Sequence, residues 1–307
     1  MRIVYMGTPD FAVPPLQALL EAGHEVAAVF TRPDKPRGRR MALTPPPVKV
    51  LARAAGIPVV QPATLKDGAA AKRIAALRPD VIVVAAYGKI LPKAVLEIPP
   101  FGCVNLHASL LPKYRGASPV QAALVNGETV TGVTAMKMAE GLDTGDILLS
   151  ESTPVGPDEN AQELTGRLSR LGAGLIVRTL EALRAGTLRP EPQDDGKSCY
   201  APMLTREMSP VDWKLSAGQI HNRVRGLYPW PGAGASFRGR GLKLLRSRVA
   251  GNRAGTPGEA VRENGRFLVC CGGGTAIELL EVQPEGGKRM SGADFLRGHP
   301  VEGIVLT

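Results

Sequence analysis

Short apolar runs alternate with longer amphipathic stretches through the first part of the chain. The apolar runs predict strands at residues 2–6, 25–30, 58–62, 80–87, 103–107, 130–138 and 147–153. Helical spacing predicts helices that end at Gly23, that begin at Pro45–Pro47, and that cover 69–78, 117–126 and 160–185. The run DVIVVAAY at 80–87 has little polar alternation, which is typical of a strand buried on both faces of a parallel sheet. This order predicts an α/β fold with a Rossmann-like, mostly parallel open sheet.

The pattern changes near Gly186, where helical spacing stops. The stretch TLRPEPQDDGKSCYAP at 187–202 is rich in proline and charge, which is typical of a linker. Beyond it, residues 212–225 have helical spacing, and short β-like segments then alternate with glycine turns, as in a small barrel or sandwich. Because 307 residues exceed a comfortable single core, we expect two domains. Their expected boundaries are 1–188 for the first domain, 189–205 for the linker and 206–307 for a smaller C-terminal β-barrel domain.

The charge of the chain favours a polyanionic partner. The formal net charge is +10, and such basicity makes nucleic-acid binding a candidate. Between Arg206 and Arg266, 12 Lys or Arg face 4 Asp or Glu, a net of +8. A solvated basic surface without a partner remains the alternative explanation.

The composition also indicates the cellular location of the protein. No apolar run approaches the roughly 20 residues of a membrane-spanning helix. The N-terminal apolar stretch is interrupted at Gly7 and has no small-residue cleavage site, so we expect no signal peptide and a cytoplasmic location. The cysteines show neither a CxxC pair nor metal-ligand spacing, and we expect reduced thiols and no metal site. These cysteines are Cys103, Cys199, Cys270 and Cys271.

The sequence after the first predicted strand lacks the glycine pattern by which a Rossmann-like sheet binds a dinucleotide. After the first strand the chain reads GTPDF at 7–11, whereas a dinucleotide site would have GxGxxG, and there is no P-loop sequence. The sequence therefore argues against an NAD-binding protein.

The most informative segment runs from Asn105 to Asp146. Asn105 and His107 are two residues apart at the end of an apolar strand, so their side chains point to the same face. Asp143 follows in the Gly-rich turn GLDTG. An amide and an imidazole that converge on one atom are hydrogen-bond donors suited to acyl-group chemistry. Taken singly, a histidine after a strand or an aspartate between glycines is more often structural. Their occurrence together and in this order favours a catalytic role.

The run NLHASLLPKYRG at 105–116, with GLDTGD downstream, resembles the folate-dependent formyltransferases. GTPDF at 7–11, AYGKILP at 86–92 and PWPGA at 229–233 extend the resemblance over the whole chain. It implies a Rossmann-like catalytic domain followed by a barrel that is similar to an OB fold. It also implies transfer of the formyl group of 10-formyltetrahydrofolate to the α-amino group of initiator methionyl-tRNA. On the matching positions the catalytic residues would be Asn105, His107 and Asp143, and the residues bordering the folate would be Ser109, Leu110, Leu111 and Pro112.

A basic stretch, TRPDKPRGRRMALTP at 31–45, is a second candidate site. It leaves the second predicted strand, and we expect a polar loop here. The family resemblance implies that this loop contacts the acceptor stem of tRNA, with Arg39 at a position where relatives carry an arginine. We therefore expect tRNA binding by Arg37, Arg39 and Arg40, since basic side chains suit phosphates and base edges. A mobile surface loop is the alternative for this stretch.

Two other functions remain open. One is a small-molecule formyltransferase acting on an amino sugar nucleotide or a ribotide, which would share the catalytic motifs. The other is a basic nucleic-acid-binding protein with an inactive α/β domain, against which the joint presence of Asn105, His107 and Asp143 speaks.

Overall fold

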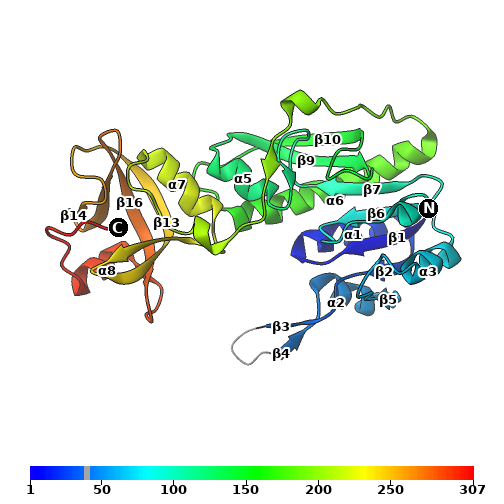
Figure 1. Ribbon diagram of the computed structural model, residues 1–307, viewed down its shortest axis with the longest axis horizontal. Coiled ribbons are helices and arrows are strands. Elements are labelled where there is room, and N and C mark those ends of the chain that lie inside the picture. The colour runs from blue at the N-terminus through cyan, green and yellow to red at the C-terminus, as the bar shows by residue number, and fades with distance from the viewer. Residues whose placement is uncertain (38–41) are drawn as a thin grey trace. The chain divides into compact units, whose positions relative to one another are not determined.

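The computed structural model of the protein describes residues 1–37 and 42–307 (Figure 1). The chain divides into two compact units. The first unit comprises Met1–Gly116, Thr131–Thr153 and Thr165–Tyr200. The second unit comprises Ala117–Val130, Pro154–Leu164 and Ala201–Thr307. The domain boundaries expected from sequence, at 188 and 206, stay a prediction.

A seven-stranded sheet forms the centre of the first unit, in the order β10-β9-β7-β6-β1-β2-β5. The pairs β1–β2, β1–β6, β2–β5 and β6–β7 are parallel, and β9 is antiparallel to β7. The Rossmann-like, mostly parallel sheet expected from sequence is thus confirmed. The strands are β1 (Arg2–Gly7), β2 (Glu25–Phe30), β5 (Val59–Val60), β6 (Val81–Ala85), β7 (Cys103–His107), β9 (Val130–Lys137) and β10 (Ile147–Pro154).

Helices cover the sheet and bury its central strands. Every residue of β6 is buried, as its apolar sequence predicts for a strand covered on both faces. Helix α6 (Ala161–Ala185) packs closely at Gly172, where a Cβ would lie 2.6 Å from a methyl carbon of Leu106 on β7. The other helices of this part are η1 (Asp10–Ala12), α1 (Val13–Glu21), α2 (Pro47–Ala54), α3 (Ala69–Leu77), α4 (Lys93–Leu96) and η2 (Asp195–Lys197). The short strand β8 (Arg115–Gly116) also belongs to this unit, and Tyr200 of β11 (Tyr200–Ala201) is its last residue.

The basic stretch at 31–45 differs from the loop expected there. Strands β3 (Lys35–Arg37) and β4 (Ala42–Thr44) pair antiparallel and form a two-stranded sheet of their own (Figure 1). Lys49, whose side chain is 7% exposed, fixes the base of this hairpin. Its Nζ donates to both carboxylate oxygens of Asp34, at 2.7 and 2.8 Å, and to Gln61 Oε1 at 2.8 Å. The expectation of a loop was wrong at residues 35–37 and 42–44, because two three-residue strands among prolines and charged residues give no periodic signal.

An antiparallel sheet forms the second unit, in the order β12-β13-β16-β15-β14, with β17 paired to β16. This confirms the smaller C-terminal β domain expected from sequence. Phe237, Phe267 and Phe295 pack in its core with ring centroids 5.1 and 5.3 Å apart. The strands are β12 (Ala233–Phe237), β13 (Arg240–Asn252), β14 (Ala260–Glu263), β15 (Arg266–Cys271), β16 (Thr275–Pro284) and β17 (Met290–Ser291). The helices are α5 (Pro119–Val125), η3 (Arg206–Met208), α7 (Ala217–Gly226) and α8 (Gly292–Gly298).

Over the described residues, none of the helices combines the length and the apolar character needed to cross a membrane.

Candidate active site

Asn105 and His107 lie on β7 at the point where the strand leaves the sheet. Both point to the same face, because side chains alternate along a strand, and His107 lies opposite Thr134 of the antiparallel strand β9. The turn between β9 and β10 returns Asp143 to this face. Asp143 Oδ1 lies 3.5 Å from Asn105 Nδ2, and Asp143 Oδ2 lies 3.6 Å from His107 Nδ1. The structure therefore brings the three sequence-predicted side chains together.

The glycines around Asp143 have a steric reason. Asp143 has a φ of +52°, in the left-handed region that L residues rarely adopt. At Gly145 a Cβ would lie 1.7 Å from the carbonyl oxygen of Lys137, so no larger residue fits. This close approach sets the tight turn, which aims the carboxylate back at β7.

His107 is oriented by a backbone carbonyl. Its ring is only 6% exposed, and Nε2 lies 2.9 Å from the carbonyl oxygen of Tyr114. A carbonyl oxygen only accepts, so the proton assigned to the neutral ring sits on Nε2. Nδ1 is then the atom that faces Asp143, and it becomes a donor only when the ring is doubly protonated.

The segment Ser109–Pro112 follows His107 and is held by hydrogen bonds to Thr134 on β9 and to Lys113. Thr134 Oγ1 donates to the Ser109 carbonyl at 2.7 Å and accepts the Leu111 N–H at 3.1 Å. The hydroxyl of Ser109, itself fully buried, donates to the Lys113 carbonyl at 2.7 Å. Leu110 and Pro112 are half-buried and keep part of their apolar surface accessible. A ligand beside this segment would therefore meet Leu110 and Pro112 rather than the polar groups of Ser109.

Sequence reasoning missed several residues that support the trio. The Gly116 N–H donates to Asp143 Oδ2 at 2.9 Å. Gln193 donates to the backbone carbonyls of Asp143 and Gly145, and its own oxygen accepts from Arg115. Arg115 stood inside the motif that resembles the formyltransferases and could have been found there. Gln193 stood in the segment read as a linker, and no pattern in that segment marks it.

The basic residues of the stretch at 31–45 are only partly within the described residues. Arg37 ends β3, with its backbone paired to Ala42. Arg39 and Arg40 lie outside the described residues, so their predicted contacts stay predictions.

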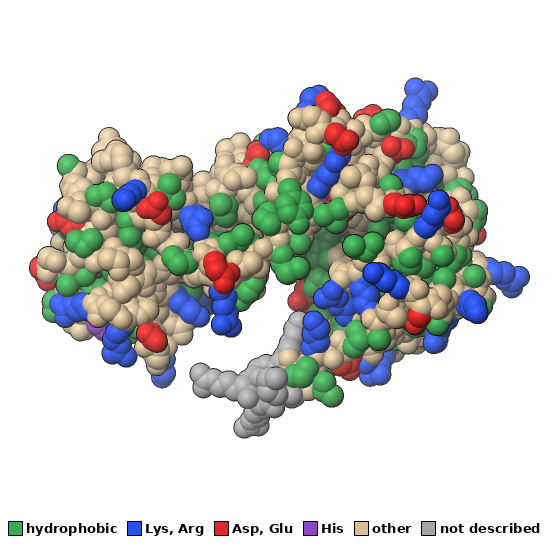
Figure 2. Space-filling view, viewed as in Figure 1, with side chains coloured by type: hydrophobic (Ala, Val, Ile, Leu, Met, Phe, Trp, Pro, Cys, Tyr) green, Lys and Arg blue, Asp and Glu red, His purple; other side chains and the backbone are tan. Residues whose placement is uncertain are grey.

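The second unit exposes a row of basic side chains. Along β13, Leu242, Leu244 and Ser247 are buried, whereas Lys243, Arg246 and Arg248 are exposed. Figure 2 shows that Lys and Arg side chains also occur across the visible surface, with Asp and Glu among them. Some basic residues have acidic partners, such as Arg266 with Glu278 at 2.8 Å.

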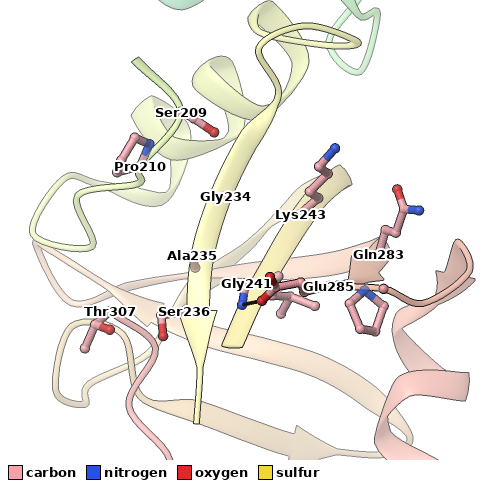
Figure 3. Close-up of a pocket in the computed structure, with 13 residues that line it drawn as sticks. Ser209, Pro210, Gly234, Ala235, Ser236, Gly241, Lys243, Gln283, Glu285 and Thr307 are labelled. Atoms are coloured by element: carbon pink, nitrogen blue, oxygen red, sulfur yellow. Dashed lines mark hydrogen bonds between the residues drawn. The ribbon is translucent and has the colours of Figure 1, made fainter. Parts of the chain in front are cut away.

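A groove of about 550 Å³ opens in the second unit between β12, the start of β13 and the end of β16 (Figure 3). Its charged side chains are Lys243 and Glu285, and Glu285 accepts the Gly241 N–H at 3.1 Å. The groove contains none of the trio and no histidine or cysteine. The histidine and the carboxylate that face each other lie elsewhere, at the end of β7 and in the β9–β10 turn.

The cysteines are free thiols, as the sequence predicted. Burial raises the pKa of Cys103 and of Cys271 to about 12, so neither is a thiolate near neutral pH. In the described part of the chain, His, Cys, Asp and Glu side chains form no group of three placed to hold a metal ion.

Comparison with known proteins connects this site to a family. Residues 1–180 match the family "Formyl transferase", and residues 203–300 match "Formyl transferase, C-terminal domain". The methionyl-tRNA formyltransferase of Trichlorobacter lovleyi is 54% identical over 302 residues, which cover 98% of this chain and 95% of the relative. The protein of the same name from Geobacter metallireducens is 52% identical, covering 100% of this chain and 98% of the relative.

A solved structure supports the fold. The N-formyltransferase from Helicobacter canadensis, in complex with folinic acid and dTDP-3-aminofucose, has a TM-score of 0.69 and 19% identity. The match covers 90% of this chain and 98% of that one. At this identity the likeness concerns the fold alone.

Proposed function

The chain belongs to the formyl transferase family, and from that premise we propose that it transfers a formyl group from 10-formyltetrahydrofolate to the α-amino group of initiator methionyl-tRNA. The product would be N-formylmethionyl-tRNA for translation initiation. The observation that carries the proposal is the convergence of three side chains: Asp143 lies 3.5 Å from the Asn105 amide and 3.6 Å from His107 Nδ1. The chain that carries them is more than half identical to two relatives named methionyl-tRNA formyltransferase.

Asn105 and His107 are proposed to act on the formyl oxygen. The substrate amine attacks the formyl carbon, and the oxygen of that carbonyl gains negative charge. The Asn105 amide donates to this oxygen, and His107 donates from Nδ1 when its ring is doubly protonated. A donor placed at a developing oxyanion contributes roughly 10²–10³ in rate.

Asp143 is proposed to act as the general base of the reaction. The attacking nitrogen must lose a proton, and the N10 nitrogen of the folate must gain one when the C–N bond breaks. The Asp143 carboxylate accepts the first proton, directly or through a water, and the doubly protonated His107 delivers the second proton to N10 from Nδ1. Transfer of the first proton from Asp143 to the facing Nδ1 then restores both groups. The proton balance closes without a covalent enzyme intermediate.

The residues after His107 fit a folate donor. The half-buried Leu110 and Pro112 offer apolar surface, and Leu142, next to Asp143, is 54% exposed. These side chains suit the flat rings of a reduced folate, whereas Ser109 and Leu111 would border the donor mainly by shaping the turn. The 10-formyl position of the donor and a cytoplasmic setting are parts of this proposal.

The tRNA is proposed to meet two basic regions, each with a different role. Arg37, Arg39 and Arg40 of the basic stretch at 31–45 would contact the acceptor stem. Lys243, Arg246 and Arg248 on β13 would contact phosphates of the tRNA body, which position the ligand without specifying it.

A substrate comparison tests the proposal. Formyl transfer from 10-formyltetrahydrofolate would be measured with charged initiator tRNA, charged elongator tRNA, free methionine and a dTDP-linked amino sugar. We expect the highest kcat/KM with initiator tRNA. A preference for the amino sugar would instead establish the small-molecule function, whose catalytic motif would be the same.

A further inference from the structure

The segment from Glu191 to Cys199, here called the strap, lies in the stretch that its composition suggested was a linker, yet it is joined to the active-site turn. Glu191 and Ile147 exchange backbone hydrogen bonds of 2.8 and 2.9 Å just after that turn. At the other end of the strap, the Cys199 carbonyl accepts the Arg115 N–H at 2.9 Å, and the Cys199 sulfur accepts the Tyr114 N–H at 3.2 Å. The strap is thus fixed at both ends within the first unit.

Gln193 is the strap residue that reaches the turn through its side chain. Its amide nitrogen donates one hydrogen to the Asp143 carbonyl at 2.8 Å and the other to the Gly145 carbonyl at 2.7 Å. Its oxygen accepts from Nε and Nη2 of Arg115 at 3.0 and 2.9 Å. The half-buried amide of Gln193 therefore uses both N–H groups to bind the turn, and its oxygen binds Arg115 in the motif that follows His107 in the chain.

The segment that carries Arg115 also holds the carboxylate of Asp143. Gly116, next to Arg115, donates to Asp143 Oδ2 at 2.9 Å. Asp143 is consequently held at its carbonyl by Gln193 and at its carboxylate by Gly116. Its φ of +52° lies in the left-handed region, which residues other than glycine adopt uncommonly, and these external contacts support that conformation.

We propose that Gln193 is a positioning residue that fixes the Asp143 carboxylate against His107 and Asn105. This inference rests on the proposed formyl transfer, and it assigns to the supposed linker a part in the active site. Gln193 itself touches no reacting atom. A displacement of about 1 Å in a reacting group can lower a rate by ~10², so loss of the two donors should act on turnover rather than on tRNA binding.

Replacement by glutamate isolates the two donors. Gln193→Glu keeps the length and the acceptor for Arg115 but removes both N–H groups and points a carboxylate at two carbonyls. We expect kcat to fall by roughly 10–100-fold in Gln193→Glu and in Gln193→Ala, with KM for initiator tRNA within about twofold. Lys197→Ala, at a 77% exposed side chain of the same strap, is the matched control and should leave kcat unchanged.

The same substitution in an Asp143→Asn variant tests whether Gln193 acts by positioning the carboxylate or by stabilising the fold in general. In an Asp143→Asn protein the carboxylate is already absent, so adding Gln193→Glu should cost little further, as expected for residues that act together. An undiminished extra loss in that background would contradict the proposal, as would normal kcat in Gln193→Glu.

Amide hydrogen exchange gives a readout that needs no activity. The Gly116 N–H should exchange faster in folded Gln193→Glu than in wild type or Lys197→Ala, because its carboxylate acceptor has moved. Unchanged Gly116 exchange would overturn the positioning role whatever the substrate. If wild-type protein formylates no tRNA while Gly116 exchange changes as expected, the proposed function fails and the positioning inference stands.

Discussion

The turn that carries Asp143 and the basic hairpin formed by β3 and β4 are built in opposite ways. At the turn, the carbonyl and the carboxylate of Asp143 each have a partner outside the turn, and Gly145 has no room for a side chain. The hairpin strands pair with one another in a separate sheet, and the base is fixed by Lys49 through Asp34 and Gln61.

The difference matches what each region is proposed to do. Acid–base groups must keep their geometry to within fractions of an ångström, because small displacements lower the rate. Contacts to a nucleic-acid backbone depend mainly on the electrostatic attraction between basic side chains and phosphates, which weakens only gradually as the distance grows. We therefore expect substitutions at the turn to lower kcat and substitutions in the hairpin or on β13 to weaken tRNA recognition.

The largest effect is expected at β7. Asn105→Ala or His107→Ala should each lower kcat by ~10² or more, the effect of losing one donor to an oxyanion. KM for tRNA should hardly change. Steady-state formylation kinetics give both constants, and His24→Ala serves as a control histidine away from the trio. Normal turnover of either variant would remove that residue from the mechanism.

A smaller effect is expected from the basic stretch at 31–45, in which we expect Arg39 to contribute most to specificity for the initiator tRNA. Arg39→Ala should lower kcat/KM for initiator tRNA by about tenfold, the equivalent of ~1.4 kcal/mol, and Arg37→Ala by less. The comparison needs a second tRNA whose acceptor stem is paired at its end. Equal slowing of both tRNAs by Arg39→Ala would mean that Arg39 contributes only charge.

The exposed basic row on β13 should contribute through salt-dependent binding. Replacing Lys243, Arg246 and Arg248 together by alanine should reduce the slope of log affinity against log salt by up to ~0.9 for each phosphate that these side chains neutralise in the wild type. Arg266→Ala is the control, since Glu278 already neutralises that side chain. A slope equal to that of wild type would place the tRNA contacts on another surface.

The smallest effect is a pH dependence at the hairpin base. Hydrogen bonds from Lys49 and Gln61 hold the pKa of Asp34 below its usual value. A depressed pKa stabilises the fold above the unfolded pKa of about 3.9, and that stability is lost as the pH falls through the folded value. Asp34→Asn should therefore lose less stability than wild type between about pH 5 and 2 in thermal unfolding. Parallel curves for the two proteins would contradict this.

The contrast between turn and hairpin also explains what the sequence could predict. Strands such as β6 were predictable because burial on both faces requires a continuous apolar run. Asn105, His107 and Asp143 were predictable because their order and spacing belong to a family motif. The hairpin was missed because its strands are three residues long and rich in charge and proline.

Gln193 could not be predicted, for a different physical reason. Its partners, Asp143 and Gly145, lie 50 and 48 residues earlier in the chain. The residues next to Gln193 in the sequence give no sign of a contact with so distant a turn. The start of α7 is a different case. The helix begins at Ala217 rather than near 212 because Ser216 and Gln219 form a capping box there, and this local signal is present in the sequence.

The central claim is that Asn105, His107 and Asp143 act as one unit on the formyl group. Single-turnover formylation of initiator methionyl-tRNA, with Asn105→Ala, His107→Ala and the double variant, tests it most directly because it isolates the chemical step. We predict that the double substitution slows this step by far less than the product of the two single effects, as for residues acting as a unit. Fully multiplicative losses would contradict the claim and would mean that the two side chains act independently.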